Sequence, residues 1–355
     1  MISKQQYDIL IKSLNNLSLI NNLVKFETIN NQLFLSSMSE TQKLIVELEL
    51  DFLPLISFVV DGKLLLQFLR FCAPENVSFS SNNKLLNINN KISRAFVNEF
   101  PEYYNNIEPY VEFKKNFEIH SVIFSKIIKL IGKCLENSPV GVYDFANITF
   151  ENNKLIVLAT DTLRIIKVNI PFELSFSIKF NISIKNLTLI QKLFKNTISF
   201  SINEQIITAK SENMELFFQL ENLTLPDFDK LFKLEVFGSH FSVQTNLLLK
   251  AFKLMELNSK DNDTIKFQTK LLFTSQNIQI SSENMLGKTE EIVPYIDSSS
   301  VNENKIMHLN CKLVTEICES IEDDNITVFL NNNPYGPICF LTTESNILLA
   351  VFSES

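Results

Sequence analysis

The chain repeats the same order of segments three times, and this repetition limits the folds that it can adopt. The segments "ENVSFSSNNKLLNI" (75–88) and "NTISFSINEQIITA" (196–209) match in register, with Phe79 opposite Phe200. A lysine-led apolar segment of helical length precedes each of them, and a third version begins at Cys311. Three copies give units of roughly 115–125 residues, which is a usual size for one domain.

The other half of each unit repeats as well. The segment "FEIHSVIFSKIIKLI" (117–131) aligns with "FSVQTNLLLKAFKLM" (241–255), and residues 2–14 fit the same frame. Three further segments read as a strand, a short polar turn and a second strand: 26–37, 150–161 and 273–284. Each unit therefore predicts an α+β domain, in which two helices pack on one face of an antiparallel sheet.

The divisions between units follow turns that contain proline. "EFPEY" (99–103) and "TLPDF" (224–228) each come after a repeated strand pair, and we expect a new domain to begin shortly after each. Within the middle unit, apolar residues occupy every second position from Leu174 to Ile184, which is typical of a strand with one buried face. The expected domains are residues 1–114, 115–236 and 237–355.

Basic residues recur at matching places on the predicted helices. Lys126, Lys129 and Lys133 are three and four residues apart, so they lie on one face of a helix. One such face is ordinary on a solvated helix, but here it recurs in a chain with a net charge of −8. This segregation of charge suits a surface that touches DNA phosphates without reading bases. The residues that we expect to face DNA are Lys12, Arg70, Lys126, Lys129, Lys133, Lys192, Lys195, Lys250 and Lys253.

The second predicted helix of the third unit departs from this pattern. Glu316, Glu319 and Glu322 follow Lys312 there, so this helix is predicted to repel DNA. The acidic net charge argues against a generally basic nucleic-acid coat and leaves room for a local basic surface.

The sequence shows no constellation typical of an enzyme, a metal site or a membrane protein. Its three His residues lie far apart, and the phosphate-loop, dinucleotide-binding, HExxH and GxSxG motifs are absent. We interpret "IEDD" (321–324) as a solvated loop rather than a metal site. The five Cys include no CxxC pair, which favours reduced thiols in a cytoplasm. We expect no signal peptide, membrane span, catalytic residue, metal or cofactor.

Two local segments and the order of the repeats resemble a known family. "LIVLATDTLRI" (155–165) is similar to a strand and turn that read roughly V-A-T-D-G-H-R-L in the bacterial sliding clamp, the beta subunit of DNA polymerase III. "LPDFDKLF" (225–232) is similar to the F-P-D-Y segment of that family. The resemblance covers the whole chain, with three similar domains of this size in this order.

The resemblance implies a processivity factor of DNA replication without enzymatic activity. In that family, two chains associate head to tail into a ring of six domains, with helices lining the hole and sheets outside. The ring encircles duplex DNA independently of sequence and tethers the replicative polymerase. Polymerase and clamp loader bind through short peptides.

The resemblance also implies a groove for those peptides between the second and third domains. Thr162 and Leu163 stand where the family usually has Gly-His, and the tail "AVFSES" replaces an apolar, Pro-containing ending, so the preferred peptide can differ. By the residues alone, ordinary core positions are the alternative interpretation of Ile165, Leu231 and Val351, and we favour the groove. The groove residues carried over are Phe145, Thr160, Thr162, Leu163, Arg164, Ile165, Pro226, Lys230, Leu231, Tyr335, Pro337, Leu349, Val351 and Phe352.

Two other functions stay open at the level of sequence. One is a clamp-like scaffold that binds replication or repair partners without loading onto DNA, which the acidic helix and the altered tail allow. The other is a diverged DNA-processing enzyme, which would need a carboxylate or His cluster in space.

Overall fold

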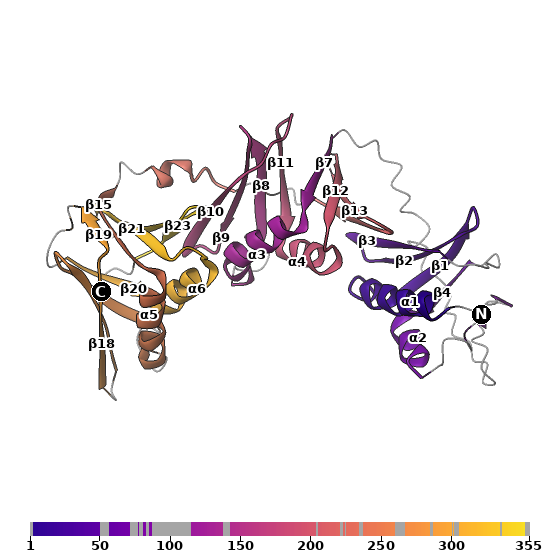
Figure 1. Cartoon of the computed structure of the whole chain (residues 1–355), viewed down its shortest axis with the longest axis horizontal. Coiled ribbons are helices and arrows are strands. Elements are labelled where there is room, and N and C mark those ends of the chain that lie inside the picture. Colours follow the sequence, from indigo (N-terminus) through magenta and orange to yellow (C-terminus); the bar gives the residue numbers. More distant parts are fainter. Residues whose placement is uncertain are drawn as a thin grey trace. The chain divides into compact units, whose positions relative to one another are not determined.

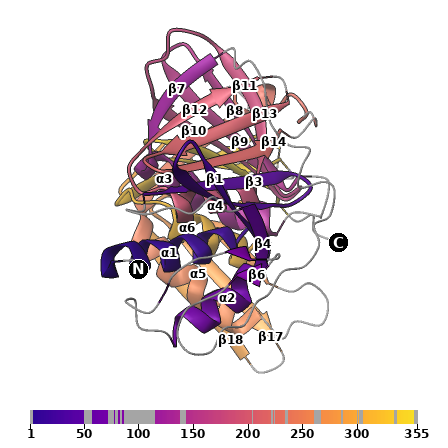
Figure 2. The same ribbon diagram turned by 90° about the vertical axis from the view of Figure 1, so that its right-hand side faces the viewer.

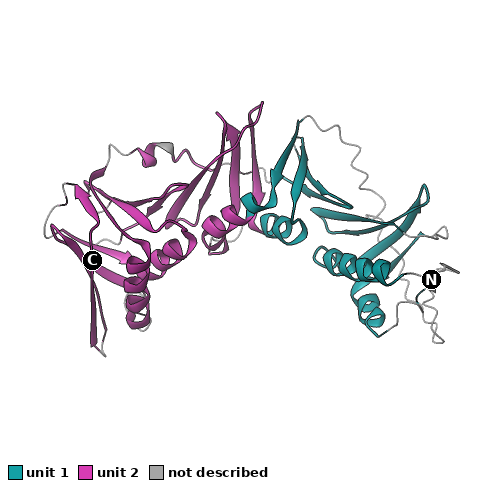
Figure 3. Cartoon of the chain, viewed as in Figure 1, with its two compact units in different colours: residues 1–124, 185–220 teal, residues 125–184, 221–355 magenta. Residues whose placement is uncertain are grey.

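The computed structural model of the chain is α+β, with antiparallel strand pairing throughout the described sheets (Figure 1). The structure describes residues 3–49, 57–71, 77, 81–82, 85–86, 115–137, 143–203, 205–220, 223, 225–233, 237–259, 267–284, 287–299, 301, 305–333 and 336–351. The chain divides into two compact units (Figure 3). Unit 1 comprises residues 1–124 and 185–220, and unit 2 comprises residues 125–184 and 221–355.

Unit 1 contains a sheet of eight antiparallel strands in the order β4-β1-β2-β3-β14-β13-β12-β7. The strands are β1 (Leu23–Ile29), β2 (Gln32–Met38), β3 (Gln42–Leu48), β4 (Ser57–Asp61), β7 (Lys115–His120), β12 (Thr197–Ile202), β13 (Ile206–Ser211) and β14 (Met214–Gln219). Because β3 pairs with β14, one sheet continues from the first predicted repeat into the second. A separate two-stranded ladder joins β5 (Ser81–Asn82) to β6 (Leu85–Leu86).

The helices of unit 1 pack against this sheet. Helices α1 (Lys4–Leu17) and α2 (Gly62–Leu69) contact each other and lie beside the β1–β4 part of the sheet (Figure 1 and Figure 2). Each begins at a side chain that caps the helix: the Ser3 hydroxyl accepts from the Gln6 N–H, and the Asp61 carboxylate accepts from the Leu64 N–H. Helix α4 (Ile184–Leu193) precedes β12, and its buried face includes Leu187.

Unit 2 contains two antiparallel sheets, in the orders β11-β8-β9-β10-β23-β22-β21-β15-β19 and β18-β17-β16-β20. The first comprises β8 (Phe145–Glu151), β9 (Lys154–Thr160), β10 (Arg164–Pro171), β11 (Ile178–Ser183), β15 (Phe237–Gln244), β19 (Asp297–Ser299), β21 (Asn325–Asn331), β22 (Ile338–Leu341) and β23 (Ser345–Leu349). The second comprises β16 (Gln268–Phe273), β17 (Asn277–Asn284), β18 (Gly287–Pro294) and β20 (Ile306–Asn310). Pairing of β10 with β23 joins the second predicted repeat to the third.

Among the described residues of unit 2, three α-helices and one short 3₁₀ helix accompany these sheets. Helix α3 (Ser121–Glu136) belongs to unit 2 from Ser125 onward. Helices α5 (Thr245–Ser259) and α6 (Cys311–Ser320) contact each other, and α5 also packs on β17 and β18. The 3₁₀ helix η3 (Asp229–Phe232) lies in the segment before β15.

Asparagine pairs explain two of the predicted strand–turn–strand segments. Asn30 and Asn31 connect β1 to β2, and Asn152 and Asn153 connect β8 to β9, all with positive φ between 49° and 63°. Two-residue loops with this backbone match the twist of a hairpin, and asparagine tolerates it better than most residues. The prediction for 273–284 is only partly right, because β16 already ends at Phe273.

Two other predicted elements differ from the structure. The strand expected from Leu174 to Ile184 begins only at Ile178. Ile178 lies opposite Phe150, and β8 ends one residue later at Glu151, so the residues before Ser177 have no β8 residue opposite them. Ile184 is already the first residue of α4. The repeated segment 196–209 holds β12 and the start of β13, as predicted, whereas most of its counterpart at 75–88 lies outside the described residues.

Candidate functional site

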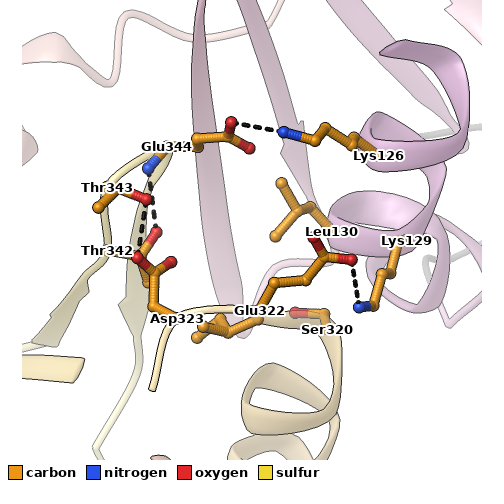
Figure 4. Close-up of a pocket in the computed structure, with 10 residues that line it drawn as sticks. Lys126, Lys129, Leu130, Ser320, Glu322, Asp323, Thr342, Thr343 and Glu344 are labelled. Atoms are coloured by element: carbon orange, nitrogen blue, oxygen red, sulfur yellow. Dashed lines mark hydrogen bonds and ion pairs between the residues drawn. The ribbon is translucent and has the colours of Figure 1, made fainter. Parts of the chain in front are cut away.

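A pocket in unit 2 contains two of the lysines that the sequence predicts to face DNA (Figure 4). Helix α3 forms one wall, and the segments that follow α6 and β22 form the other. The cavity volume is about 240 Å³. Its lining residues are Lys126, Lys129, Leu130, Ser320, Ile321, Glu322, Asp323, Thr342, Thr343 and Glu344.

Both lysines of this pocket are bound to carboxylates across it. Lys126 Nζ lies 2.7 Å from Oε1 of Glu344, and Lys129 Nζ lies 2.8 Å from Oε1 of Glu322 (Figure 4). The hydrogen bond to Glu344 raises the pKa of Lys126 above its usual value. The hydrogen bond from Lys129 lowers the pKa of Glu322 below its usual value. Both shifts favour the charged forms, so Lys126 and Glu322 are charged at neutral pH.

The same pairing extends to neighbouring helices of unit 2. Lys253 Nζ on α5 lies 2.7 Å from Oε1 of Glu319 on α6, and Lys133 Nζ lies 3.2 Å from Oε2 of Glu136. Lys250, also on α5, is exposed. The acidic helix that the sequence predicts to repel DNA thus supplies direct partners to the predicted basic face.

The remaining residues predicted to face DNA belong to unit 1, and all are exposed. Lys12 lies on α1, and Arg70 caps the C-terminus of α2 with Nη2 3.5 Å from Oδ1 of Asn15. Lys192 lies in the last turn of α4, and Lys195 follows the helix and donates to the carbonyl of Gln191.

The predicted peptide groove centres on the turn between β9 and β10. The Leu163 carbonyl accepts from the Ala350 N–H, and Arg164 pairs with Leu349 in the ladder. Ile165 packs with Phe232 of η3 against a small buried cluster of Phe237, Cys339 and Leu348. The structure thereby brings together the start of β10, the residues after β23 and the region of η3, which are far apart in sequence.

The carried-over groove residues fall into three groups by exposure. Thr162, Leu163, Pro226, Lys230 and Leu231 are exposed; Ile165, Pro337 and Val351 are half-buried; Phe145, Thr160, Arg164 and Leu349 are buried. Tyr335 and Phe352 lie outside the described residues. Among the buried group, Thr160 donates to the Arg164 carbonyl and Leu349 pairs with Arg164 in the ladder.

Arg164 is the clearest supporting residue. Its Nε atom donates to Oδ2 of Asp161 at 2.8 Å, and its Nη2 atom lies 2.7 Å from Oε2 of Glu316 on α6. Asp161 also accepts from the Leu163 and Arg164 N–H groups, which fixes the turn. The sequence analysis did not identify Glu316 as a partner of Arg164. The two residues are far apart in the chain, so no local spacing relates them.

The described residues add two findings that bear on chemistry. No group of three or more His, Cys, Asp or Glu side chains within these ranges could hold a metal ion. No helix in the described part of the chain is long and apolar enough to cross a membrane.

Comparison with known proteins gives no match to a family model or to a curated protein, but many matches to solved structures. A putative DNA polymerase III beta subunit from Eubacterium rectale matches with a TM-score of 0.86 at 15% identity, over 98% of each chain. The DNA polymerase III beta chain from Streptococcus pneumoniae matches with 0.84 at 14%, and a Helicobacter pylori beta clamp bound to a DNA ligase peptide with 0.82 at 16%, again over 98% of each chain. The chain has the fold of the DNA polymerase III beta subunit. In this beta-clamp fold, the lysine pocket and the turn at Arg164 both lie in unit 2 of the chain.

Proposed function

We propose that the protein is a DNA sliding clamp, a non-catalytic cytoplasmic processivity factor that encircles duplex DNA and tethers the replicative polymerase. The observation that carries the proposal is the likeness to beta subunits over 98% of both chains, with TM-scores of 0.80–0.86. The recurring pattern of basic helices supports it, because a sequence-blind ligand needs contacts to phosphates only.

We also propose that the chain holds three clamp domains, at 1–114, 115–236 and 237–355, and closes a ring as a head-to-tail homodimer. Strands β3 and β10, which correspond in the repeats, each pair with a strand of the following repeat. The corresponding strand of the third repeat is β18, which is one of the two edge strands of its sheet among the described residues. An edge strand offers unpaired backbone groups to another chain, so β18 is the place for a second copy.

The groove is proposed as the docking site for short peptides of the polymerase and the clamp loader. The exposed Leu163 and Leu231, with the half-buried Ile165, provide apolar surface there. One similar structure is a beta clamp bound to a DNA ligase peptide, which supports peptide recognition as the mode of partner binding.

Retention on circular DNA tests the main proposal. The protein is loaded onto a nicked circular plasmid with the clamp loader of its own source and is then moved to salt that abolishes direct binding. We expect it to stay on the circle and to be lost after the plasmid is linearised, because a closed ring leaves only over a free end. Equal loss from circular and linear DNA would contradict the proposal.

A scaffold that binds partners without loading is the second candidate. The observation that favours it is the pairing of Lys126, Lys129 and Lys253 with carboxylates, which reduces the charge available to phosphates. Peptide binding without any retention on the circle would be the result expected of such a scaffold.

A further inference from the structure

We propose that Glu319, Glu322 and Glu344 bind the lysine side chains of α3 and α5 that DNA phosphates would otherwise bind. These carboxylates would thereby set the affinity of the two helices for DNA. The inference rests on the proposed function, because it concerns the residues that would contact DNA. It assigns control of DNA affinity to three particular carboxylates rather than to the net charge of the chain.

The contacts have the geometry that a phosphate would have. The distances from Nζ to the carboxylate oxygen are 2.7 Å for Lys126 and Lys253 and 2.8 Å for Lys129. These are charge-assisted hydrogen bonds of ordinary length, and a phosphate oxygen offers the same acceptor to an ammonium group. Each lysine is therefore already bound to an anion when DNA arrives.

The exposure of these pairs permits exchange. All six side chains are between about one-third and two-thirds exposed, and ion pairs at such surfaces are weak. A phosphate can consequently displace a carboxylate at small cost. The displaced carboxylate, however, stays within about 8 Å, the Debye length at physiological salt, and continues to repel the phosphate.

The position of the carboxylates makes the effect local. Glu319 lies in the last turn of α6, Glu322 follows that helix, and Glu344 lies in the turn between β22 and β23. Two of their lysine partners, both on α3, line the same pocket (Figure 4). The third lies on α5, which contacts α6. One short stretch and one turn thus neutralise lysines on two helices.

The test compares direct binding of a short linear duplex by wild type and by the triple variant Glu319→Gln, Glu322→Gln, Glu344→Gln. Affinity is measured by fluorescence anisotropy across a series of salt concentrations. Each released lysine adds a phosphate contact, so the slope of log K against log salt should steepen by about 2 to 3. At low salt the affinity should rise by about tenfold or more. An unchanged affinity and slope would overturn the proposal, including the case in which neither protein binds measurably.

A matched control separates local pairing from net charge. The variant Glu40→Gln, Glu151→Gln, Glu173→Gln changes the net charge by the same amount, at exposed sites on one strand and in two loops. This variant should stay within about twofold of wild type, since a distant surface charge is screened at physiological salt. A gain equal to that of the first variant would overturn the local mechanism.

Replacing the lysines tests whether the gain in DNA affinity depends on them. Adding Lys126→Ala, Lys129→Ala and Lys253→Ala to the glutamine variant should return the affinity to the wild-type level. Persistence of the gain would also overturn the proposal. Because a short linear duplex reports direct affinity alone, this result is independent of retention on a circle, and either proposal can fail while the other stands.

Discussion

The guanidinium of Arg164, at the start of β10, forms an ion pair with Glu316 of α6, with Nη2 2.7 Å from Oε2. The side chain of Arg164 is 2% exposed and that of Glu316 is 12% exposed. Asp161 completes the network from within the turn. The ion pair between Arg164 and Glu316 therefore holds the turn that carries the exposed Leu163 against helix α6.

Replacing Arg164 with Met should lower the free energy of unfolding by about 3–5 kcal/mol, because it leaves two carboxylates without their buried cation. The matched control is Lys133→Met, which breaks the exposed pair with Glu136 and should cost less than about 1 kcal/mol. Urea denaturation of both variants measures the difference. Equal losses would show that the buried network does not stabilise the fold.

Replacing Thr162 with Gly should stabilise the protein by about 0.5–1 kcal/mol. Thr162 is exposed and has a φ of 77°, a left-handed conformation that is strained for a β-branched residue and free for glycine. The control is Thr197→Gly on the extended strand β12, where added backbone freedom should destabilise instead. Thermal melts of the two variants should shift in opposite directions, and a shared loss would contradict the strain at Thr162.

The sequence predicts those parts of the fold whose signals are local. The asparagine pairs at 30–31 and 152–153 define their hairpins by backbone preference alone, and the repeats place the six α-helices of the described residues in the right order. The start of the strand predicted from Leu174 is wrong because it depends on a non-local contact. Alternation of apolar residues is a local signal, but a strand also needs a pairing partner, and β8 ends at Glu151.

The electrostatics of the candidate site could not be predicted in the same way. Lys126 and Glu344 are 218 residues apart, and Lys129 and Glu322 are 193 apart, so no periodicity relates them. Helix spacing predicts a shared basic face, and Lys126 and Lys129 do line one pocket, but which carboxylates pair with them depends on tertiary packing. The sequence does not predict the burial of Arg164 either, because arginine is usually exposed and its partner is brought to it by tertiary packing.

The buried cysteines give a prediction about thiol reactivity. Cys134, Cys311, Cys318 and Cys339 are free and buried, and burial raises the pKa of all four thiols, to about 12 for Cys318 and Cys339. Thiolate is the reactive form, so at about pH 8 a disulfide reagent should react slowly with these thiols in the native protein.

The measurement uses the variant Cys72→Ser, because Cys72 lies outside the described residues. Native protein should release little chromophore from Ellman-type reagent, and the protein unfolded in urea should release four equivalents. Rapid reaction of more than one thiol in the native state would contradict the burial.

Introducing a charge into the edge strand β18 should weaken the proposed dimer. Ile292 is 58% exposed on β18, and an aspartate there would place a charge beside the pairing chain. Ile292→Asp should raise the dimer dissociation constant at least about tenfold, which corresponds to about 1.4 kcal/mol. Sedimentation equilibrium measures it, with Ile306→Asp on β20, at the opposite edge of the same sheet, as the control. Equal dimerisation of both variants would place the second copy elsewhere.

Charging the exposed part of the groove should abolish binding of polymerase-derived peptides and leave the fold intact. Leu163 and Leu231 are 46% and 43% exposed, so glutamates there remain solvated, whereas a charge at Ile165 would enter the cluster around Leu348. An apolar peptide side chain that displaces water there would leave those carboxylates desolvated and unpaired, which is costly. The variant Leu163→Glu, Leu231→Glu should therefore lose at least about tenfold in peptide affinity by fluorescence anisotropy. The control Leu19→Glu, Leu257→Glu adds the same charges at exposed leucines of other segments and should bind as wild type. Unchanged affinity in the first variant would mean that the peptide docks on another surface.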